Sequence, residues 1–197
     1  MSSRSWRSTI LGAVVLGGAL GAASLGVGYA DGRDDDDDDD ESRQARVLLR
    51  DQAGQSVGVV KLSQKRSEVV VRVDADGVPA GFHGFHVHAV GQCVPPFTSA
   101  GGHYNPTGVG HGDHAGDMPS LLVNDDGSAE MRFETDRFTV RELFDADGSA
   151  IIVHADRDNF ANIPDRYHSH VEDVFGPDSA TLATGDAGAR LACGVVR

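Results

Sequence analysis

Short valine-rich runs, separated by polar turns, recur along the chain from Ala45 onward. Such runs, bounded by clusters of Asp, Asn and Gly, indicate short β-strands joined by turns. The predicted strands cover residues 46–49, 57–62, 68–73, 85–90, 120–123, 129–133 and 150–154. Evenly spaced short strands of this kind predict an all-β sandwich or barrel.

Two long segments, residues 91–119 and 155–188, do not follow this rhythm. Irregular segments of this length are uncommon in compact domains, and those that occur are usually functional. We therefore expect both segments to be functional loops.

The N-terminal part of the chain has a different pattern. Arg4 and Arg7 precede an apolar run from Ile10 to about Val27, and a small-residue cleavage site follows at positions 28–30. These features predict that residues 1–30 are a signal peptide. The apolar run approaches the length of a membrane span, so an uncleaved membrane anchor is the alternative.

Residues 31–44 form an acidic low-complexity segment that contains seven consecutive aspartates, Asp34 to Asp40. Like charges repel one another and build no core, so the segment is predicted to be a solvated, disordered linker. Weak capture of cations such as calcium or copper by the clustered carboxylates is the alternative. The folded domain is then predicted to span residues 45–197.

The chain carries a formal net charge of −13. This charge argues against nucleic acid as a partner. Residues 31–41 contribute −8 and residues 1–30 contribute +2, so residues 42–197 still carry −7. Such a body repels an anionic substrate on average, so local positive charge has to guide it.

The two cysteines, Cys93 and Cys193, lie 100 residues apart. In an exported protein they can form one long-range disulfide. Loop closure of that length contributes about 4–5 kcal/mol in a chain-entropy treatment. Two unrelated buried thiols are the alternative.

Six of the nine histidines lie between His83 and His114. Side chains of a strand alternate between its two faces, so His86 and His88 share one face at a separation of about 6–7 Å. Two imidazoles on one rigid face are a ready pair of metal ligands. His83 has the opposite parity and is predicted to be a hydrogen-bonded structural histidine.

A second group of ligand-type residues lies in the glycine-rich segment that follows. His103, His111, His114 and Asp117 offer three nitrogen ligands and one oxygen ligand, which suit a tetrahedral zinc shell. A polar surface loop with incidental histidines is the alternative.

His154 ends an apolar run and can reach into a site that neighbouring loops build. Imidazole is a preferred copper ligand, so a copper site at His86 and His88 needs further nitrogen. His154 and His103 are the available donors.

Four segments together resemble the signatures of the copper/zinc superoxide dismutase family, bacterial secreted type. They are Gly81-Phe-His-Gly-Phe-His-Val-His88, Gly101-Gly-His-Tyr-Asn-Pro106, Val153-His-Ala155 and Gly185-Asp-Ala-Gly-Ala-Arg-Leu-Ala-Cys-Gly194. They occur in the family's order, and the resemblance covers residues 45–197. It implies an eight-stranded Greek-key β-barrel whose two large loops correspond to the two irregular segments.

The resemblance also implies a set of site residues. The implied copper ligands are His86, His88, His103 and His154. The implied zinc ligands are His103, which bridges the two ions, together with His111, His114 and Asp117. The remaining implied residues are Asp158, a carboxylate that links the two sites, Arg190 beside the copper, and the disulfide pair Cys93 and Cys193. Only Gly112 and Asp113 separate His111 from His114, fewer residues than is usual in the family, so copper is the firmer expectation.

The implied reaction is the dismutation of two superoxide anions to dioxygen and hydrogen peroxide. The family runs it through a Cu(II)/Cu(I) cycle in which His103 delivers a proton and Arg190 attracts the anion. A copper-binding protein without enzymatic activity and a purely structural β-sandwich are the alternatives.

The expected location is outside the cytoplasm, either periplasmic or extracellular, with no stable membrane association if the signal peptide is cleaved. A homodimer is possible. His168 and His170 match no ligand of the family and are predicted to be exposed loop residues, with weak additional metal binding as the alternative.

Overall fold

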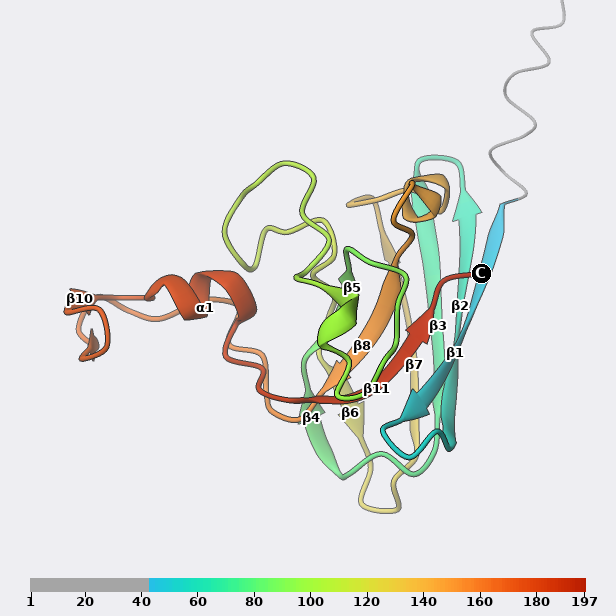
Figure 1. The fold of residues 1–197 in the computed structure, drawn as a ribbon, viewed down its shortest axis with the longest axis horizontal. Coiled ribbons are helices and arrows are strands. Elements are labelled where there is room, and N and C mark those ends of the chain that lie inside the picture. The colour runs from blue at the N-terminus through green and yellow to red at the C-terminus, as the bar shows by residue number, and fades with distance from the viewer. Residues whose placement is uncertain (1–42) are drawn as a thin grey trace, which may run out of the picture. The chain divides into compact units, whose positions relative to one another are not determined.

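The computed structural model describes residues 43–197. The predicted signal peptide and all but the last two residues of the predicted acidic linker lie outside this part of the chain. Figure 1 shows the described residues as a curled sheet with long loops on one side. Within residues 43–197, no helix is long and apolar enough to cross a membrane.

The described residues are mostly strands and loops. The strands are β1 (Gln44–Asp51), β2 (Ser56–Lys65), β3 (Glu68–Ala75), β4 (Gly81–His83), β5 (Phe85–His88), β6 (Leu121–Val123), β7 (Ala129–Thr135), β8 (Ala150–His154), β9 (His168–Ser169), β10 (Val174–Phe175) and β11 (Arg190–Val195). The helical elements are α1 (Ser179–Thr184) and two 3-10 turns, η1 (Thr98–Ala100) and η2 (Arg141–Phe144).

Seven strands form one antiparallel sheet in the order β5-β8-β11-β1-β2-β3-β7. β4 pairs with β6, and β4 and β5 are one strand interrupted at Gly84. A tight turn at residues 124–128 joins β6 to β7, so β6 bridges β4 and β7 and completes the ring. With β4 and β5 counted as one, eight strands make the barrel, which confirms the predicted Greek-key fold.

Two strand predictions differ from the structure. The predicted strand 85–90 ends at His88 and is preceded by β4, because the chain is interrupted at Gly84. A Cβ at Gly84 would lie 2.6 Å from the Cβ of Ala187, so the second long loop requires a glycine there. The sequence analysis did not predict β11, which contains Gly194, a residue that is uncommon inside strands. The glycine is required because β1 passes close by: a Cβ at Gly194 would lie 2.6 Å from Leu48 O.

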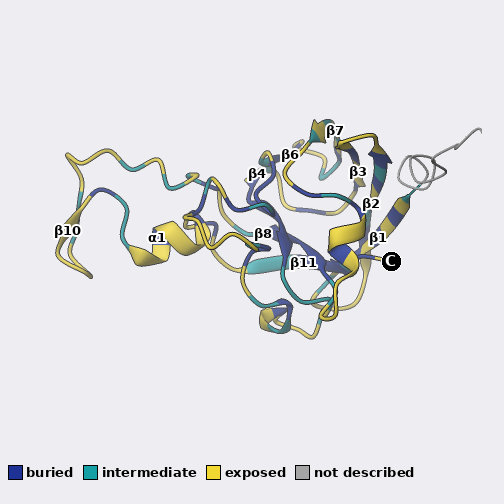
Figure 2. Cartoon of the chain, turned by 90° about the horizontal axis from the view of Figure 1, so that it is seen from above, coloured by how far each residue is buried: buried dark blue, intermediate teal, exposed yellow. Residues whose placement is uncertain are grey.

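The second long segment is more regular than predicted. It contains the hairpin of β9 and β10 and the helix α1, which we call together the arm (residues 160–184). The Asp178 side chain accepts a hydrogen bond from the backbone N–H of Thr181 and caps α1, and Gly185 ends the helix in the left-handed region at φ 59°. Figure 2 shows that most of the arm is exposed.

β5 is buried on both faces. Phe85 and Val87 point into the barrel core, which β1, β2, β3 and β8 fill mainly with valine, leucine and isoleucine. His86 and His88 occupy the other face and are also fully buried, because the two long loops cover them. The alternation predicted from the sequence therefore places the histidine pair in an enclosed space outside the core.

Gln64 joins β2 to the loop after β7 through hydrogen bonds of its buried side chain. Its Nε2 donates to Arg66 O at 2.7 Å, and its Oε1 accepts from the backbone N–H of Val140 at 2.9 Å, in a site where the side chain is 4% exposed. Gln64→Leu keeps the volume but leaves these backbone groups unpaired. We expect the free energy of unfolding in urea to fall by about 3 kcal/mol. The exposed control Lys65→Gln should change it by less than about 0.5 kcal/mol; equal values for both variants would contradict the assignment.

Candidate metal centre

Six histidines and one aspartate gather on the outer side of β5, beneath the long loops. One group of four has its candidate ligand atoms within 4.8 Å of one another and is wholly buried: His86, His88, His103 and His154. A second buried group that meets the same condition is His86, His103, His111 and Asp117. The groups share two histidines, so the structure places two candidate metal positions side by side.

Backbone pairing with β5 brings the loop residues to the strand. His88 forms an isolated antiparallel bridge with His103, and His86 forms one with Asp117. Between them, Val87 O accepts from Tyr104 N at 2.8 Å. The first long loop therefore pairs with β5 at two separate points. Each bridge places a candidate ligand residue of the loop, His103 or Asp117, beside a histidine of the strand.

The first group presents nitrogen lone pairs to one another. His88 Nδ1 lies 3.0 Å from the carbonyl of Gly101 and His154 Nδ1 lies 3.2 Å from the carbonyl of Gly188, so both Nδ1 atoms are placed to donate. The two Nε2 atoms then face each other as acceptors at 3.2 Å. Such a contact is repulsive unless a cation binds between the nitrogens.

Burial keeps these rings in the form that binds a metal. It lowers the pKa of His88 well below its ordinary value, that of His154 to about 3 and that of His86 to about 4. In the cases of His88 and His86, the neighbouring His103 adds to the effect. Neutral imidazole is the ligand form, so these nitrogens do not need to lose a proton before binding.

The second group has the spacing of a tetrahedral shell. Asp117 Oδ1 lies 3.0 Å from His103 Nδ1, 3.2 Å from His111 Nδ1 and 3.3 Å from His114 Nδ1. A tetrahedron with zinc–ligand distances of about 2.0–2.1 Å has edges of about 3.3–3.4 Å. His114 therefore completes this shell, whereas His86 turns its Nε2 to Asp158.

The short loop between His111 and His114 still permits this convergence. Gly112 takes up a left-handed conformation at φ 91°, and a Cβ there would lie 2.8 Å from Phe160 O. The backbone N–H groups of Gly112 and His114 both donate to Asp117 Oδ2. The loop thus folds around the carboxylate, and the residues present fit a zinc ion.

Asp158 joins the two groups. Its Oδ2 lies 2.6 Å from His86 Nε2, and its Oδ1 lies 2.8 Å from His111 Nε2. Burial opposes ionisation of this carboxyl, but the hydrogen bonds with His111 and His86 hold its pKa well below the usual range. For His111, burial alone would lower the pKa, yet Asp117 and Asp158 outweigh it and raise the pKa to about 9.

Asp158 leaves the other ring nitrogen of His86 and of His111 directed toward the two groups. His86 Nδ1 is buried and has no hydrogen-bond partner, and His111 Nδ1, also buried, lies 3.2 Å from Asp117 Oδ1 without the alignment of a hydrogen bond. Buried polar atoms are rarely left unpaired, so each requires an explanation. A cation bound by each group supplies it, because Asp158 orients both rings with Nδ1 toward the candidate metal positions.

Arg190 is positioned by the first long loop. Its Nη1 donates to Phe97 O at 2.5 Å and its Nη2 donates to Gly101 O at 2.6 Å. The carbonyl of Gly101 is the same one that faces His88 Nδ1. Arg190 lines a pocket of about 370 Å³ together with His103 and His154.

The disulfide between Cys93 and Cys193 is present, as predicted, with the two Cα atoms 5.7 Å apart. It ties the first long loop to β11, the strand that begins at Arg190. The loop carbonyls that hold Arg190 therefore belong to a covalently anchored segment.

Three further histidines lie outside both groups. His83 Nδ1 lies 2.7 Å from His154 O, and His83 Nε2 lies 2.7 Å from Pro79 O, so this ring is a buried hydrogen-bonded support behind the site. His168 and His170 lie on the arm, with ring centroids 4.9 Å apart. His168 pairs with Asp173 at 2.9 Å, and neither belongs to a candidate ligand group.

Sequence reasoning missed Arg137, which follows β7 and belongs to no motif. Its Nη1 donates to the carbonyls of Gly112 and His114, at 2.9 and 3.1 Å, and its Nη2 lies 3.9 Å from Asp113 Oδ1. The guanidinium thus holds the short loop closed from outside. A single basic residue after a strand gave no signal of this role.

Removal of Arg137 should weaken the second group selectively. We expect Arg137→Ala to lower zinc affinity by about tenfold, the smaller effect typical of residues that orient ligands, while copper content stays unchanged. Chelator competition and elemental analysis measure both. Arg141→Ala, an exposed change in η2, is the control; equal loss of both metals in Arg137→Ala would contradict a local role.

Gly185 is a second residue outside the two groups that affects them, because it packs against Asp158, the carboxylate that joins them. Its φ is +59°, and a Cβ there would overlap Asp158 Oδ1 and His111 Nε2. Gly185→Ala should therefore displace the carboxylate and weaken binding of both metals by about tenfold or more. Gly108→Ala is a matched control, since Gly108 has φ +68° but open space around it. Metal content of the two purified variants tests this, and equal retention in both would exclude the proposed overlap.

Comparison with known proteins places these observations in a family. Residues 56–196 match the family model described as copper/zinc superoxide dismutase. The chain is 42% identical over 157 residues to proteins named Cu-Zn superoxide dismutase from Mycobacterium tuberculosis and Mycobacterium bovis, a match that covers 73% of this chain. It covers 65% of the length of those relatives.

More distant proteins give the same result. A Cu-Zn superoxide dismutase from Aquifex aeolicus is 31% identical over 167 residues, which cover 78% of this chain and 86% of that protein. The crystal structure of a SOD-like protein from Bacillus subtilis superposes with a TM-score of 0.60 at 28% identity, covering 76% of this chain and 96% of the other. The fold, the seven converging candidate ligand residues and these matches together show that the chain belongs to the copper/zinc superoxide dismutase family.

Proposed function

We propose that this chain is a superoxide dismutase, which converts two superoxide anions and two protons into one dioxygen and one hydrogen peroxide. The proposed copper ligands are His86, His88, His103 and His154. The proposed zinc ligands are His103, His111, His114 and Asp117. The observation that carries the proposal is that the four-histidine group lies beside a pocket whose wall includes a fixed arginine.

The two ions have different capacities. When bound, copper supplies a Cu(II)/Cu(I) couple, whereas zinc has no redox chemistry and supplies charge and orientation. The chain's own contribution to a redox site of this kind is to hold the ligands, admit the anion and deliver protons.

His103 is the residue suited to deliver a proton. Its Nδ1 faces Asp117 and His114 at 3.0 and 3.3 Å, which leaves Nε2 for the first group. The ring also lines the pocket that Arg190 lines. Nε2 can therefore take up a proton at the copper side and pass it to a reduced anion in the pocket, while Nδ1 stays fixed on the zinc side.

Arg190 supplies the local positive charge that the acidic body requires. Two of its five N–H donors are used by the carbonyls of Phe97 and Gly101, which leaves others for a bound anion. A guanidinium held at two points presents those donors in a fixed direction. A copper store would need no such guide, so this geometry favours the enzyme over a copper-binding protein of the same fold.

We propose further that the protein is exported, with residues 1–30 as its signal peptide, residues 31–44 as an acidic linker and residues 45–197 as the catalytic domain. The disulfide supports an oxidising compartment, since such bonds are rare in the cytosol. A periplasmic or an extracellular location is equally consistent with this support.

A dismutation assay on the metal-loaded chain tests the activity, and Arg190 variants test the guide. We expect Arg190→Ala to lower the rate by about tenfold and to reduce its dependence on ionic strength, since the steering charge is lost. Arg190→Lys retains the charge and should keep the salt dependence while losing part of the rate.

Copper content, measured in parallel, should be the same in all three proteins. An Arg190→Ala enzyme with wild-type rate and salt dependence would remove this residue from the mechanism. A fully copper-loaded wild-type chain without activity would favour the copper-binding alternative.

A further inference from the structure

The exposed face of β1 carries an unusual concentration of positive charge. In the antiparallel pairing of β1 with β2, Arg46 stands directly opposite Lys61. On the other side of β1, the backbones of Arg46 and Arg197 exchange hydrogen bonds at 2.6 and 3.2 Å. Arg43 lies just before β1 and Arg50 lies near its end, so all five cations surround one strand. We call Arg43, Arg46, Arg50, Lys61 and Arg197 the basic patch.

The basic patch has no ion-pair partner among the described residues. Arg50 donates to the carbonyl of Gly54, and no member forms a salt bridge in this part of the chain. The adjoining hollow, of about 560 Å³, is lined by three of the arginines and by one carboxylate, Asp51, which accepts from the backbone of Gln55. Like charges directly opposite each other destabilise a sheet, so an uncompensated row here is costly.

The same row is compensated where it continues across the sheet. Lys61 stands opposite Arg72 in β3, and Arg72 stands opposite Arg132 in β7. There, however, Arg132 pairs with Glu134 at 2.6 Å, and Asp74 follows Arg72 on the same face. On this face Lys65 of β2 also lies 3.9 Å from Glu134. The acidic partners therefore lie toward β3 and β7, and the β1 side of the row has none among the described residues.

The missing anions are present in the chain immediately before β1. Residues 35–41 are seven consecutive acidic side chains, and only Ser42 separates them from Arg43. They carry −7 against the +5 of the basic patch. Seven residues reach about 23 Å when extended, whereas adjacent strands of the patch are about 4.8 Å apart. A partner tethered this closely acts at an effective concentration in the millimolar range.

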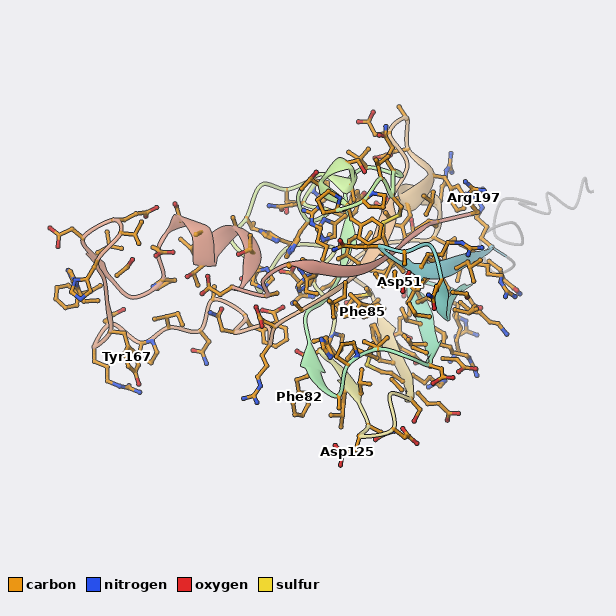
Figure 3. The ribbon with its side chains drawn as sticks, turned by 60° about the horizontal axis from the view of Figure 1, so that its bottom comes forward. Asp51, Phe82, Phe85, Asp125, Tyr167 and Arg197 are labelled. Atoms are coloured by element: carbon orange, nitrogen blue, oxygen red, sulfur yellow. A yellow bond between two sulfur atoms is a disulfide. The ribbon has the colours of Figure 1, made fainter. Side chains whose placement is uncertain are left out.

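We propose that the acidic segment, residues 35–41, docks on the basic patch of its own chain. Its carboxylates supply the negative charge that Asp74 and Glu134 provide on the other half of the same face. Figure 3 places Arg197, a member of the patch, and Tyr167 of the arm at opposite ends of the view. Docking neutralises a cationic face that would otherwise compete with Arg190 for anions.

The two lysines of the chain make a direct test. Carbodiimide joins a carboxylate to an amine only where the two are in contact, and Lys61 and Lys65 are the only lysine side chains in the sequence. Both lie on the exposed face of β2. Lys65 lies at the end of β2 beside the point where the acidic segment enters, since Gln64 N bonds to Arg43 O. It also lies 3.9 Å from Glu134, whose carboxylate competes for it, so the loss of the Lys61 crosslink in Arg46→Ser at an unchanged Lys65 yield is the decisive readout. Lys61 is reached only if the segment folds back over Arg46.

We expect peptide mapping of the full chain to show Lys61 joined to residues 35–41 in several-fold higher yield than Lys65, with the excess lost at high salt. Arg46→Ser should abolish the excess, whereas Arg72→Ser, in the compensated half of the row, should leave it unchanged. A yield at Lys61 equal to or below that at Lys65 would overturn the proposal. Crosslinks between ¹⁵N-labelled and unlabelled chains in a mixture would also overturn it, and would assign the segment to a second copy.

Discussion

The two faces of β5 are buried for different reasons, and the metal centre follows from that difference. Phe85 and Val87 pack into the barrel core and fix the strand against the sheet. His86 and His88 then project into a space that only loops can close. His103 and Asp117 are held in place by backbone pairing with His88 and His86. The strand thus sets the positions of two residues from an otherwise irregular segment.

The two groups of the centre differ in charge, and two bound cations would be stabilised by both. Burial disfavours charge on the rings near His88 and His154, so the first group is a set of neutral donors. Two ionised carboxylates, Asp117 and Asp158, lie on the other side and favour positive charge around His111. The second group therefore carries negative charge and the first group is uncharged. This difference matches the ligand preferences of zinc and of copper, respectively.

The sequence was sufficient for the fold class and for the disulfide, and it indicated residues that the structure brings together as candidate ligands. Local regularity gave the strands and the His86/His88 pair, whereas the resemblance to the family supplied the rest of the ligand set. Strand parity separated His86 and His88 from their apolar neighbours, and turn residues marked the strand ends. What the sequence did not reveal depends on contacts between distant segments. Gly84 and Gly194 interrupt or thin strands only because another chain segment passes close by. Arg137 acts through two carbonyls of a loop 23 and 25 residues away, and no pattern marks such a pairing.

The carbonyl oxygen of Gly101 connects two residues of the site that have different roles. It accepts from Arg190, the proposed anion guide, and it faces Nδ1 of His88, a proposed copper ligand. The segment that bears it is fastened to β11 by the Cys93–Cys193 bond. Reduction of that bond would loosen substrate capture and metal coordination in one event. One covalent bond between distant segments thus supports both the guanidinium and the imidazole that share this carbonyl.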